Sequence, residues 1–284
     1  MDKPVVIITG ASSGFGLLSS IEFLKKGYFV VATMRDIQKK EQVIHQLHNP
    51  TLEGNLLFCQ LDVTDADSLQ AFQVILQRLG RVDILLNNAG FATGGFAEEI
   101  SISEYRTQFE TNFFGLIEVT KLVLPFMRQQ RSGKIINLSS ISAQIGFPGL
   151  SPYVASKYAL EGWSESLQLE LRPFGIDIAL IEPGSYQTNI WSSGKKIAEK
   201  SMLSTSPYHE MMKKIEARLE KNQESYGDPL EVAKFITGLA EKPSLTKLRY
   251  PIGKGTRLSF FLKKSLPWKV WEGIVLKMLH IDRK

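Results

Sequence analysis

Tyr153 and Lys157 are the two residues whose types and spacing best suit acid–base chemistry. They lie four positions apart in a segment with helical spacing, so both side chains project from one face of the predicted helix. A phenol with a pKa near 10 is a poor base at neutral pH, but an ammonium about 4 Å away, at an effective dielectric constant of about 20, favours the phenolate by roughly 4 kcal/mol. The pair therefore predicts a tyrosine that accepts and donates a proton.

A glycine-rich turn supplies a second kind of chemistry, the binding of phosphate. The run Thr9-Gly10-Ala11-Ser12-Ser13-Gly14-Phe15-Gly16 follows an apolar strand and precedes a helical pattern. Gly10 permits a tight turn, Gly14 lets the backbone approach a pyrophosphate, and Gly16 allows the helix to pack closely on the strand. Such a turn is often only a turn, but the strand before it and the helix after it are the context that a dinucleotide site requires.

Short β-branched runs alternate with longer helical patterns along the chain. The runs cover residues 5–9, 28–34, 56–61, 84–87, 134–138 and 177–182, and the helical patterns cover 15–26, 67–79, 103–130, 152–173 and 229–240, with Asp67 as a cap. This alternation predicts a parallel sheet with helices on both faces. No linker rich in Gly, Ser or Pro divides the chain, so we expect one Rossmann-like, doubly wound α/β domain over residues 1–284, with about seven strands.

Together, these motifs resemble those of the short-chain dehydrogenase/reductase family. The resemblance covers residues 4 to about 190 and rests on the glycine motif at 9–16, on Asn87-Asn88-Ala89-Gly90 and on Tyr153-x-x-x-Lys157. It implies that a pyrophosphate is held by Gly10, Ser12, Ser13, Gly14, Phe15 and Gly16. It also implies that Asp62 and Val63 meet the adenine and that Asn88, Ala89 and Gly90 lie beside the adenosine ribose. Taken singly, Asp62 also fits a cap, and residues 87–90 also fit a turn.

The same resemblance implies the catalytic roles. Ser140, thirteen residues before Tyr153, and Tyr153 itself would bind a carbonyl oxygen while the nicotinamide delivers hydride. Tyr153 would deliver the proton, and Lys157 would also hold the nicotinamide ribose. Ser139 competes with Ser140 for its role, and only the family spacing favours Ser140.

Further positions match the family outside the tyrosine helix. Asn112 matches an asparagine that holds a water in the proton relay, although it also fits a polar residue in a buried helix. In the segment after the sixth strand, Pro183, Gly184 and Thr188 match residues at the nicotinamide, where a threonine contacts the carboxamide. The four histidines share no metal-ligand spacing, so we expect no metal; they are His45, His48, His209 and His280.

The end of the second strand predicts the choice of nicotinamide cofactor. An acidic side chain there hydrogen-bonds the ribose 2′-hydroxyl of NAD and repels the extra phosphate of NADP, whereas an arginine binds that phosphate. In the family register the acidic position holds Met34, Arg35 follows it, and Ser12 adds a hydroxyl donor. Asp36 would favour NAD if the register moved by one residue, although it also fits a helix cap. We expect NADP(H) in preference to NAD(H).

Residues 185–226 are predicted to cover the substrate, and the irregular stretch 184–206 is predicted to be a mobile loop. The cover is rich in apolar, adaptable side chains: Ile190, Trp191, Met202, Leu203, Tyr208, Met211, Met212 and Ile215. They indicate a hydrophobic substrate, although ordinary helix packing explains them equally well. The chain also resembles the family branch of 17β-hydroxysteroid and retinol dehydrogenases, which implies a lipid, steroid or retinoid-like carbonyl or alcohol substrate.

Residues 255–284 form a basic C-terminal extension. The chain carries a net charge of +5, but residues 245–284 hold ten Lys/Arg and two Asp/Glu, a local +8 that leaves −3 for the rest. On a helix, one side would carry Trp268, Trp271, Ile274, Val275, Met278 and Leu279. This pattern fits peripheral contact with an anionic membrane, or an end that folds back over the pocket or a partner subunit. No basic stripe with interleaved aromatics marks the main body, so we expect no nucleic acid partner.

Composition also bears on location and on rival functions. The lone cysteine, Cys59, cannot form an internal disulfide, and the first residues lack the apolar stretch of a secretory signal, so we expect a cytoplasmic protein. No window approaches the roughly 20 apolar residues that span a bilayer. The family resemblance implies a homo-oligomer formed through helices 103–130 and 152–173. Rival functions are a 3-oxoacyl thioester reductase, a non-catalytic NADP(H) sensor and a membrane-surface scaffold.

Overall fold

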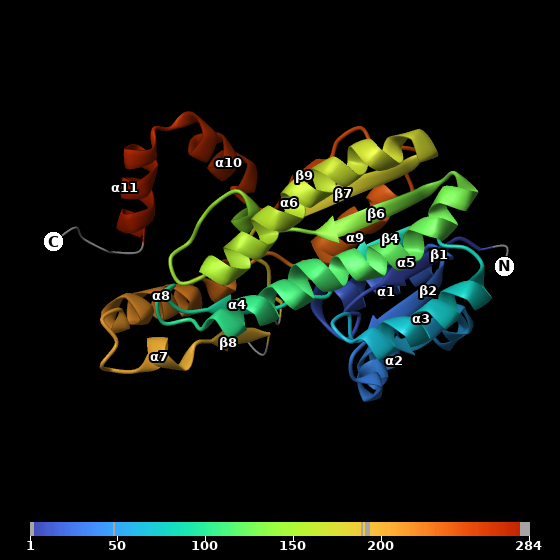
Figure 1. Cartoon of the computed structure of the whole chain (residues 1–284), viewed down its shortest axis with the longest axis horizontal. Coiled ribbons are helices and arrows are strands. Elements are labelled where there is room, and N and C mark those ends of the chain that lie inside the picture. The colour runs from blue at the N-terminus through green and yellow to red at the C-terminus, as the bar shows by residue number, and fades with distance from the viewer. Residues whose placement is uncertain (1–2, 48, 189, 191–193, 279–284) are drawn as a thin grey trace.

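The computed structural model describes residues 3–47, 49–188, 190 and 194–278 (Figure 1). Four residues named above lie outside this part of the chain: His48, Trp191, Leu279 and His280. The centre of the described chain is a parallel sheet with helices packed against both of its faces, which confirms the predicted Rossmann-like architecture.

Seven parallel strands form the central sheet in the order β3-β2-β1-β4-β6-β7-β9. Their bounds are Val5–Ile8 (β1), Phe29–Met34 (β2), Leu56–Gln60 (β3), Ile84–Asn87 (β4), Gly133–Leu138 (β6), Ile176–Pro183 (β7) and Arg249–Ile252 (β9). The strand order reverses direction between β1 and β4. In an open α/β sheet, ligands bind at the carboxyl ends of the strands beside such a reversal, so this edge is where the site is expected.

Two buried layers of apolar side chains hold the helices on the sheet. One layer packs α1 (Gly14–Lys25), α2 (Lys40–Leu47) and α9 (Pro229–Ala240) on one face, and the other packs α3 (Ala66–Leu79), α5 (Gly115–Gln130) and α6 (Ser151–Leu171) on the opposite face. All four residues of β1 are fully buried, with Val6 and Ile8 in the first layer and Val5 and Ile7 in the second. Burial on both faces explains why this strand is apolar without alternation.

Several elements differ from the sequence prediction. The helix expected over 103–130 is divided into α4 (Ile102–Phe109), a π-helical turn (Glu110–Phe114) and α5. Asp65, not Asp67, caps α3, because its carboxylate accepts a hydrogen bond from the Ser68 amide at 2.7 Å. Strand β9 was absent from the predicted runs; its Pro251 is tolerated because β9 lies at the sheet edge.

The stretch 184–206 also differs from the irregular loop that was predicted. Its residues Lys195–Ile197 form β8, which pairs in parallel with β5 (Ala92–Gly94), and Glu199–Met202 form the short helix α7. The next helix, α8 (His209–Asn222), lies at the same end of the molecule (Figure 1). Seven residues of the predicted loop therefore belong to a strand or a helix.

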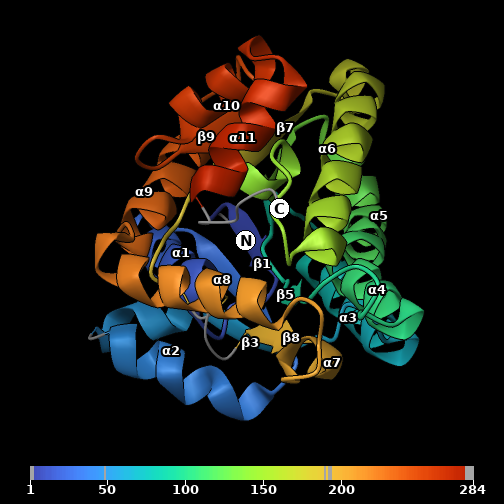
Figure 2. The same ribbon diagram turned by 90° about the vertical axis from the view of Figure 1, so that its left-hand side faces the viewer.

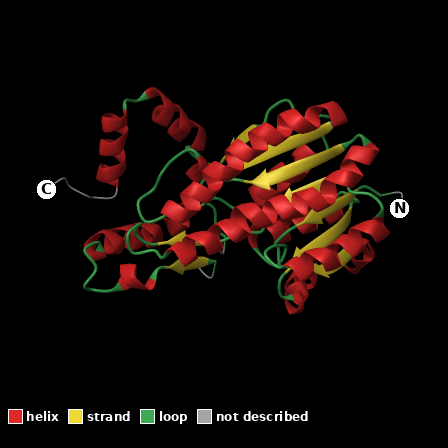
Figure 3. Cartoon of the chain, viewed as in Figure 1, coloured by secondary structure: helices red, strands yellow, loops and turns green. Residues whose placement is uncertain are grey.

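The C-terminal extension consists of α10 (Thr256–Ser265) and α11 (Trp268–Met278), which stand apart from the central sheet in Figure 1; Figure 2 shows the molecule from the side on which they lie. Figure 3 shows this extension and the α7–α8 region on the side to which the arrowhead of β6 points. Across the described residues, no helix is both long enough and apolar enough to span a membrane.

Candidate active site

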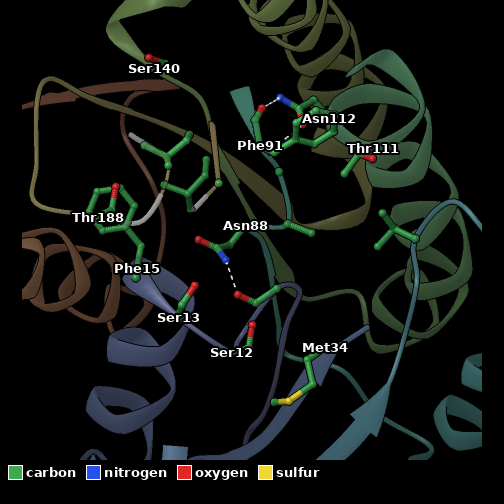
Figure 4. Close-up of a pocket in the computed structure, with 18 of the residues that line it drawn as sticks. Ser12, Ser13, Phe15, Met34, Asn88, Phe91, Thr111, Asn112, Ser140 and Thr188 are labelled. Atoms are coloured by element: carbon green, nitrogen blue, oxygen red, sulfur yellow. Dashed lines mark hydrogen bonds between the residues drawn. The ribbon is translucent and has the colours of Figure 1, made fainter. Parts of the chain in front are cut away.

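A cavity of about 540 Å³ opens at the carboxyl ends of the central strands (Figure 4). With the exception of Gly16, every residue proposed from sequence for the site lines this cavity. They are Gly10, Ser12, Ser13, Gly14, Phe15, Arg35, Asp62, Val63, Asn88, Ala89, Gly90, Asn112, Ser140, Tyr153, Lys157, Pro183, Gly184 and Thr188. Motifs that are far apart in the sequence, from residue 10 to residue 188, thus line the same cavity.

The glycine-rich turn is shaped by backbone that only glycine adopts easily. Gly10 and Gly14 have φ angles of 66° and 54°, in the left-handed region. A Cβ atom on Gly10 would lie 2.9 Å from the Cα of Ala89, and one on Gly16 would lie 2.5 Å from both the Gly10 carbonyl oxygen and the Asn88 side-chain nitrogen. Gly16 therefore permits close approach to the turn itself and to Asn88, rather than to a strand face as the sequence suggested.

Asn88 and Thr9 fasten this turn to the end of β4. The Asn88 side-chain amide donates to the carbonyl oxygens of Thr9 and Gly10 at 2.8 and 2.9 Å, and Figure 4 draws one of these two hydrogen bonds. In return, the Thr9 hydroxyl accepts from the backbone amides of Asn88 and Ala89 at 2.9 and 3.0 Å. These hydrogen bonds hold the turn in place, and Ser12 and Ser13 line the cavity beside it.

Replacing Gly16 with Ala is expected to lower the free energy of unfolding by about 1–3 kcal/mol, because the new methyl group meets two fixed atoms. Gly162, inside α6, is the matched control: a Cβ there meets nothing within 4 Å, so Ala should raise stability by about 0.5–1 kcal/mol. Urea unfolding midpoints measure both changes. Shifts in the same direction would contradict the packing argument.

The end of the cavity beside β2 carries two cations and the carboxylate of Asp36. Arg35 follows the buried Met34 at the end of β2, and Lys39 also lines the cavity. Asp36 caps the 3-10 turn Ile37–Lys39, where its carboxylate accepts from the Gln38 amide at 3.0 Å, which confirms its interpretation as a cap. Lys39 was missed from sequence, where only its position shortly after Arg35 could have indicated it.

Tyr153, Ser140 and Lys157 meet at the opposite end, and all three are buried. Tyr153 and Lys157 lie on α6, and Ser140 follows β6. The Lys157 ammonium donates to the Leu138 carbonyl oxygen at 2.6 Å and lies 5.7 Å from the centroid of the Tyr153 ring. The Ser139 hydroxyl instead donates to Glu161 at 2.5 Å. This geometry leaves Ser140, rather than Ser139, as the hydroxyl that faces Tyr153.

The electrostatics of this end differ from the sequence expectation. Burial raises the pKa of Tyr153, and a hydrogen bond with Ser140 opposes this rise. Burial also lowers the pKa of Lys157 to about 8, against the favourable charge of Glu161. The predicted lowering of the phenol pKa was therefore wrong for this structure, because removal of the phenol from water disfavours phenolate and the ammonium is directed at Leu138.

Asn112 lies within the π-helical turn, where its side chain is almost fully buried. Its amide oxygen accepts from the Phe91 amide at 3.1 Å, and its amide nitrogen donates to the Phe91 carbonyl oxygen at 3.0 Å (Figure 4). Single π-helical turns inside α-helices often occur at functional sites. This turn aims Asn112 at the segment that follows β4 and places it in the cavity wall.

Comparison with known proteins establishes the family. Residues 4–198, more than half of the chain, match the sequence model of a family described as short chain dehydrogenase. The chain belongs to the short-chain dehydrogenase family. It is therefore an oxidoreductase, as the motifs predicted.

Three relatives of this short-chain dehydrogenase illustrate its place in the family. The uncharacterized oxidoreductase YusZ of Bacillus subtilis is 48% identical over 279 residues, covering 98% of this chain and 99% of that protein. The 3-ketodihydrosphingosine reductase of Bacteroides thetaiotaomicron is 40% identical over 200 residues, 70% of each chain. Human retinol dehydrogenase 8 is 41% identical over 200 residues, 69% of this chain and 63% of that protein, which confirms the resemblance to that branch.

Solved structures share the fold. A short-chain dehydrogenase from Streptomyces avermitilis has a TM-score of 0.81 and 32% identity over 98% of both chains. The protein ElxO, solved with NADP bound, has a TM-score of 0.72 and 30% identity, covering 90% of this chain and 99% of that one.

The segment predicted to cover the substrate contacts the segment that follows β5. The Glu99 carboxylate accepts from the hydroxyls of Ser201 and Ser206, each at 2.6 Å, and the rings of Phe96 and Tyr208 stack with centroids 4.3 Å apart. Of the apolar cover residues that are described, Ile190 lines the cavity. Of the others, Met212 is buried, Met202 and Leu203 are exposed, and Tyr208, Met211 and Ile215 are half-buried.

One further wall residue of this dehydrogenase was missed from sequence. Tyr186 is 2% exposed, and its ring packs closely on Gly227 and Gly253. A Cβ atom on these glycines would lie only 2.6 and 3.1 Å, respectively, from the nearest ring atom. Its hydroxyl donates to Glu231 at 3.2 Å. The sequence around Tyr186 does not indicate this packing, because Gly227 and Gly253 are distant from Tyr186 in the sequence.

Among the described residues, no group of three or more His, Cys, Asp or Glu could hold a metal ion.

Proposed function

We propose that this short-chain dehydrogenase interconverts a carbonyl and an alcohol on a hydrophobic, lipid-like substrate, with NADP(H) as its cofactor. The observation that carries the proposal is the single cavity that joins the glycine-rich turn and Arg35 at one end to Ser140, Tyr153 and Lys157 at the other. The left-handed glycines and the fastened turn suit a pyrophosphate, so the residues present fit a dinucleotide.

When bound, the reduced nicotinamide supplies a hydride from its C4 atom. The hydroxyls of Ser140 and Tyr153 would hold the substrate carbonyl oxygen, and Tyr153 would donate the proton that completes the alcohol. Lys157 would bind the nicotinamide ribose and stabilise the phenolate left behind, and Asn112 would hold a relay water. Because burial raises the pKa of Tyr153, its phenol keeps its proton at neutral pH, which suits proton donation in the direction of reduction.

The preference for NADP(H) rests on the end of β2. Met34 stands where an acidic residue would select NAD, and Arg35 and Lys39 supply positive charge in the cavity wall. Ser12 adds a hydroxyl donor from the glycine-rich turn. The NADP bound to ElxO supports the same choice.

Two relatives support a hydrophobic substrate. One is named a 3-ketodihydrosphingosine reductase and the other a retinol dehydrogenase, and both named compounds are largely apolar. We propose that residues 185–226 of this chain cover a substrate of that kind, with Ile190 in the wall. We further propose a cytoplasmic homo-oligomer formed through α4–α5 and α6, on which Phe114, Tyr158 and Leu169 are exposed.

A panel of hydrophobic ketones and aldehydes, with a 3-oxoacyl thioester as comparison, tests this function. We expect NADPH to be oxidised with the ketones or aldehydes, and NADH to be used less well. Loss of absorbance at 340 nm measures turnover. Thioester-only activity would favour the acyl reductase, and NADPH binding without any turnover would favour a sensor, although a sensor has no need of Ser140, Tyr153 and Lys157 together.

We also propose that α10 and α11 contact anionic membranes. Residues 254–270 contain five Lys/Arg and no Asp/Glu, and large apolar side chains are exposed among them: Leu258, Phe261, Trp268 and Val270. Each basic residue near an anionic surface contributes about 1 kcal/mol. None of these residues lines the cavity; instead, Arg218 of α8 donates to the Met278 carbonyl oxygen, and Trp271 is buried.

The double replacement Phe261→Glu and Trp268→Glu is expected to abolish cosedimentation with vesicles that contain anionic lipid. Two carboxylates would then oppose the lipid charge where two aromatic rings would have entered the interface. Val74→Glu is the control, because Val74 is an exposed apolar residue on α3, outside the extension. Equal binding by the double variant, or none by the unchanged chain, would remove the membrane proposal.

A further inference from the structure

Three side chains at successive turns of α6 face the end of β6. Tyr153 hydrogen-bonds with Ser140, Lys157 donates to the Leu138 carbonyl oxygen at 2.6 Å, and Glu161 accepts from the Ser139 hydroxyl at 2.5 Å. The spacing of four residues places all three on one helix face. Three consecutive residues, from Leu138 to Ser140, are thus each held by one turn of the same helix.

The Glu161 carboxylate is itself held in place. It is 6% exposed, and the oxygen that does not meet Ser139 accepts from the Arg249 guanidinium of β9 at 2.8 Å. Arg249 also donates to Glu165, one turn further along α6, at 2.8 Å. A buried carboxylate is costly unless it is paired and hydrogen-bonded, and Glu161 has both kinds of partner.

We propose that Glu161 is a positioning residue: through Ser139 it fixes the strand end that carries Ser140, and it sets a negative charge one helical turn beyond Lys157. The inference rests on the proposed function, since Ser140 and Lys157 are assigned their roles there. Glu161 does not line the cavity, so it acts through these two neighbours and not on the substrate.

The charges around Glu161 determine the sign of its effect. Lys157 acts on it from α6, Arg249 from β9 and Glu182 from β7, while Glu165 pairs with Arg249 on the exposed side. Burial lowers the pKa of Lys157 to about 8, and the charge of Glu161 works against this lowering. Removal of that charge would let Lys157 lose its proton at a lower pH. The alkaline limb of carbonyl reduction should then move to lower pH.

Glu182 shares this buried region. Burial and the charge of Glu161 raise its pKa to about 7, and Gln144 donates a hydrogen bond to it. Neutralising Glu161 removes this repulsion, so the pKa of Glu182 should fall. A lower pKa makes Glu182 more negative near neutral pH, which partly replaces the negative charge lost from Glu161. The titration of Lys157 must therefore be followed on the alkaline side of the pH profile, above the pH range in which Glu182 titrates.

Glu161→Gln is the test variant, because it keeps the size of the side chain and removes its charge. We expect kcat for carbonyl reduction to fall about tenfold, within the ~10²-fold that a misplacement of 1 Å can cost, with little change in KM for the carbonyl substrate. The alkaline limb of the pH profile should move down by about one unit. The pH dependence of NADPH affinity, measured by fluorescence, should move in the same direction.

Glu165→Gln and Ser139→Ala are matched controls. Glu165 also pairs with Arg249 but is exposed and makes no contact with Ser139, so its replacement should leave the profile unchanged. Ser139→Ala removes the hydrogen bond and keeps the charge, so kcat should fall while the alkaline limb stays in place. If Glu161→Gln does not fold, Glu161→Asp provides the test: it keeps the charge, so we expect an unmoved alkaline limb together with a lower kcat.

Three outcomes would overturn the inference. The first is a Glu161→Gln enzyme that keeps the kcat and the alkaline limb of the parent enzyme. The second is an equal shift of the alkaline limb in Glu161→Gln and Glu165→Gln, and the third is a Glu161→Asp enzyme with unaltered kcat. Each of these would overturn the inference and leave the proposed function in place. A parent chain that reduces no carbonyl compound and binds no NADPH would overturn the proposed function, and the inference with it.

Discussion

Replacing Tyr153 with Phe is expected to lower kcat for carbonyl reduction by about 10²–10⁴-fold, while the Kd for NADPH stays within about twofold. Phe fills the same buried space and preserves the packing of the ring on α6. It removes the hydroxyl that hydrogen-bonds with Ser140 and that would protonate the substrate oxygen. Steady-state loss of NADPH absorbance gives kcat, and a fluorescence titration gives the affinity.

Tyr158→Phe is the control for this experiment. Tyr158 lies five residues further along the same helix, and the residue is 45% exposed. Tyr158 does not line the cavity, so kcat and NADPH affinity should both match those of the parent enzyme. Turnover that survives in Tyr153→Phe would reject the proposed mechanism, and loss of NADPH binding would assign Tyr153 a role in holding the cofactor.

Arg35→Ala is expected to raise the Kd for NADPH by about 10–100-fold, the effect of losing a charged hydrogen bond worth about 1.5–3 kcal/mol, and to leave the Kd for NADH unchanged. The two cofactors differ only in the phosphate that Arg35 is proposed to bind. Lys40→Ala is the control, since Lys40 is an exposed neighbour that does not line the cavity. Titrations with both nucleotides, and with 2′,5′-ADP, measure the change.

Two alternative roles for Arg35 predict different nucleotide affinities. Equal losses of NADPH and NADH affinity would mean that Arg35 shapes the cavity without recognising the phosphate. An unchanged NADPH affinity would transfer the role to Lys39, whose own replacement by Ala should then show the selective loss.

Much of the fold could be predicted from sequence because the central strands are apolar runs buried on both faces, as in β1. The elements that escaped prediction depend on tertiary contacts. Strand β9 is short and contains Pro251, and it exists because its edge pairs with β7. Strand β8 forms only against β5, and the π-helical turn at Asn112 depends on its hydrogen bonds to Phe91.

The predicted site residues share a cavity because each motif ends a strand or begins a helix at the same sheet edge. Residues without a motif were missed: Lys39 and Tyr186 in the wall, and Glu161 behind it. The pKa of Tyr153 was predicted in the wrong direction because the spacing of Tyr153 and Lys157 gives their proximity but not their burial. Burial depends on the whole fold, so a local motif does not encode it.

The most direct test of the whole account is the crystal structure of this dehydrogenase with NADPH bound. We expect the pyrophosphate over the turn that contains Gly10 and Gly14, the 2′-phosphate beside Arg35, and the nicotinamide C4 next to the Tyr153 hydroxyl. A nicotinamide ring bound away from Tyr153 and Lys157, or a nucleotide bound outside this cavity, would contradict it.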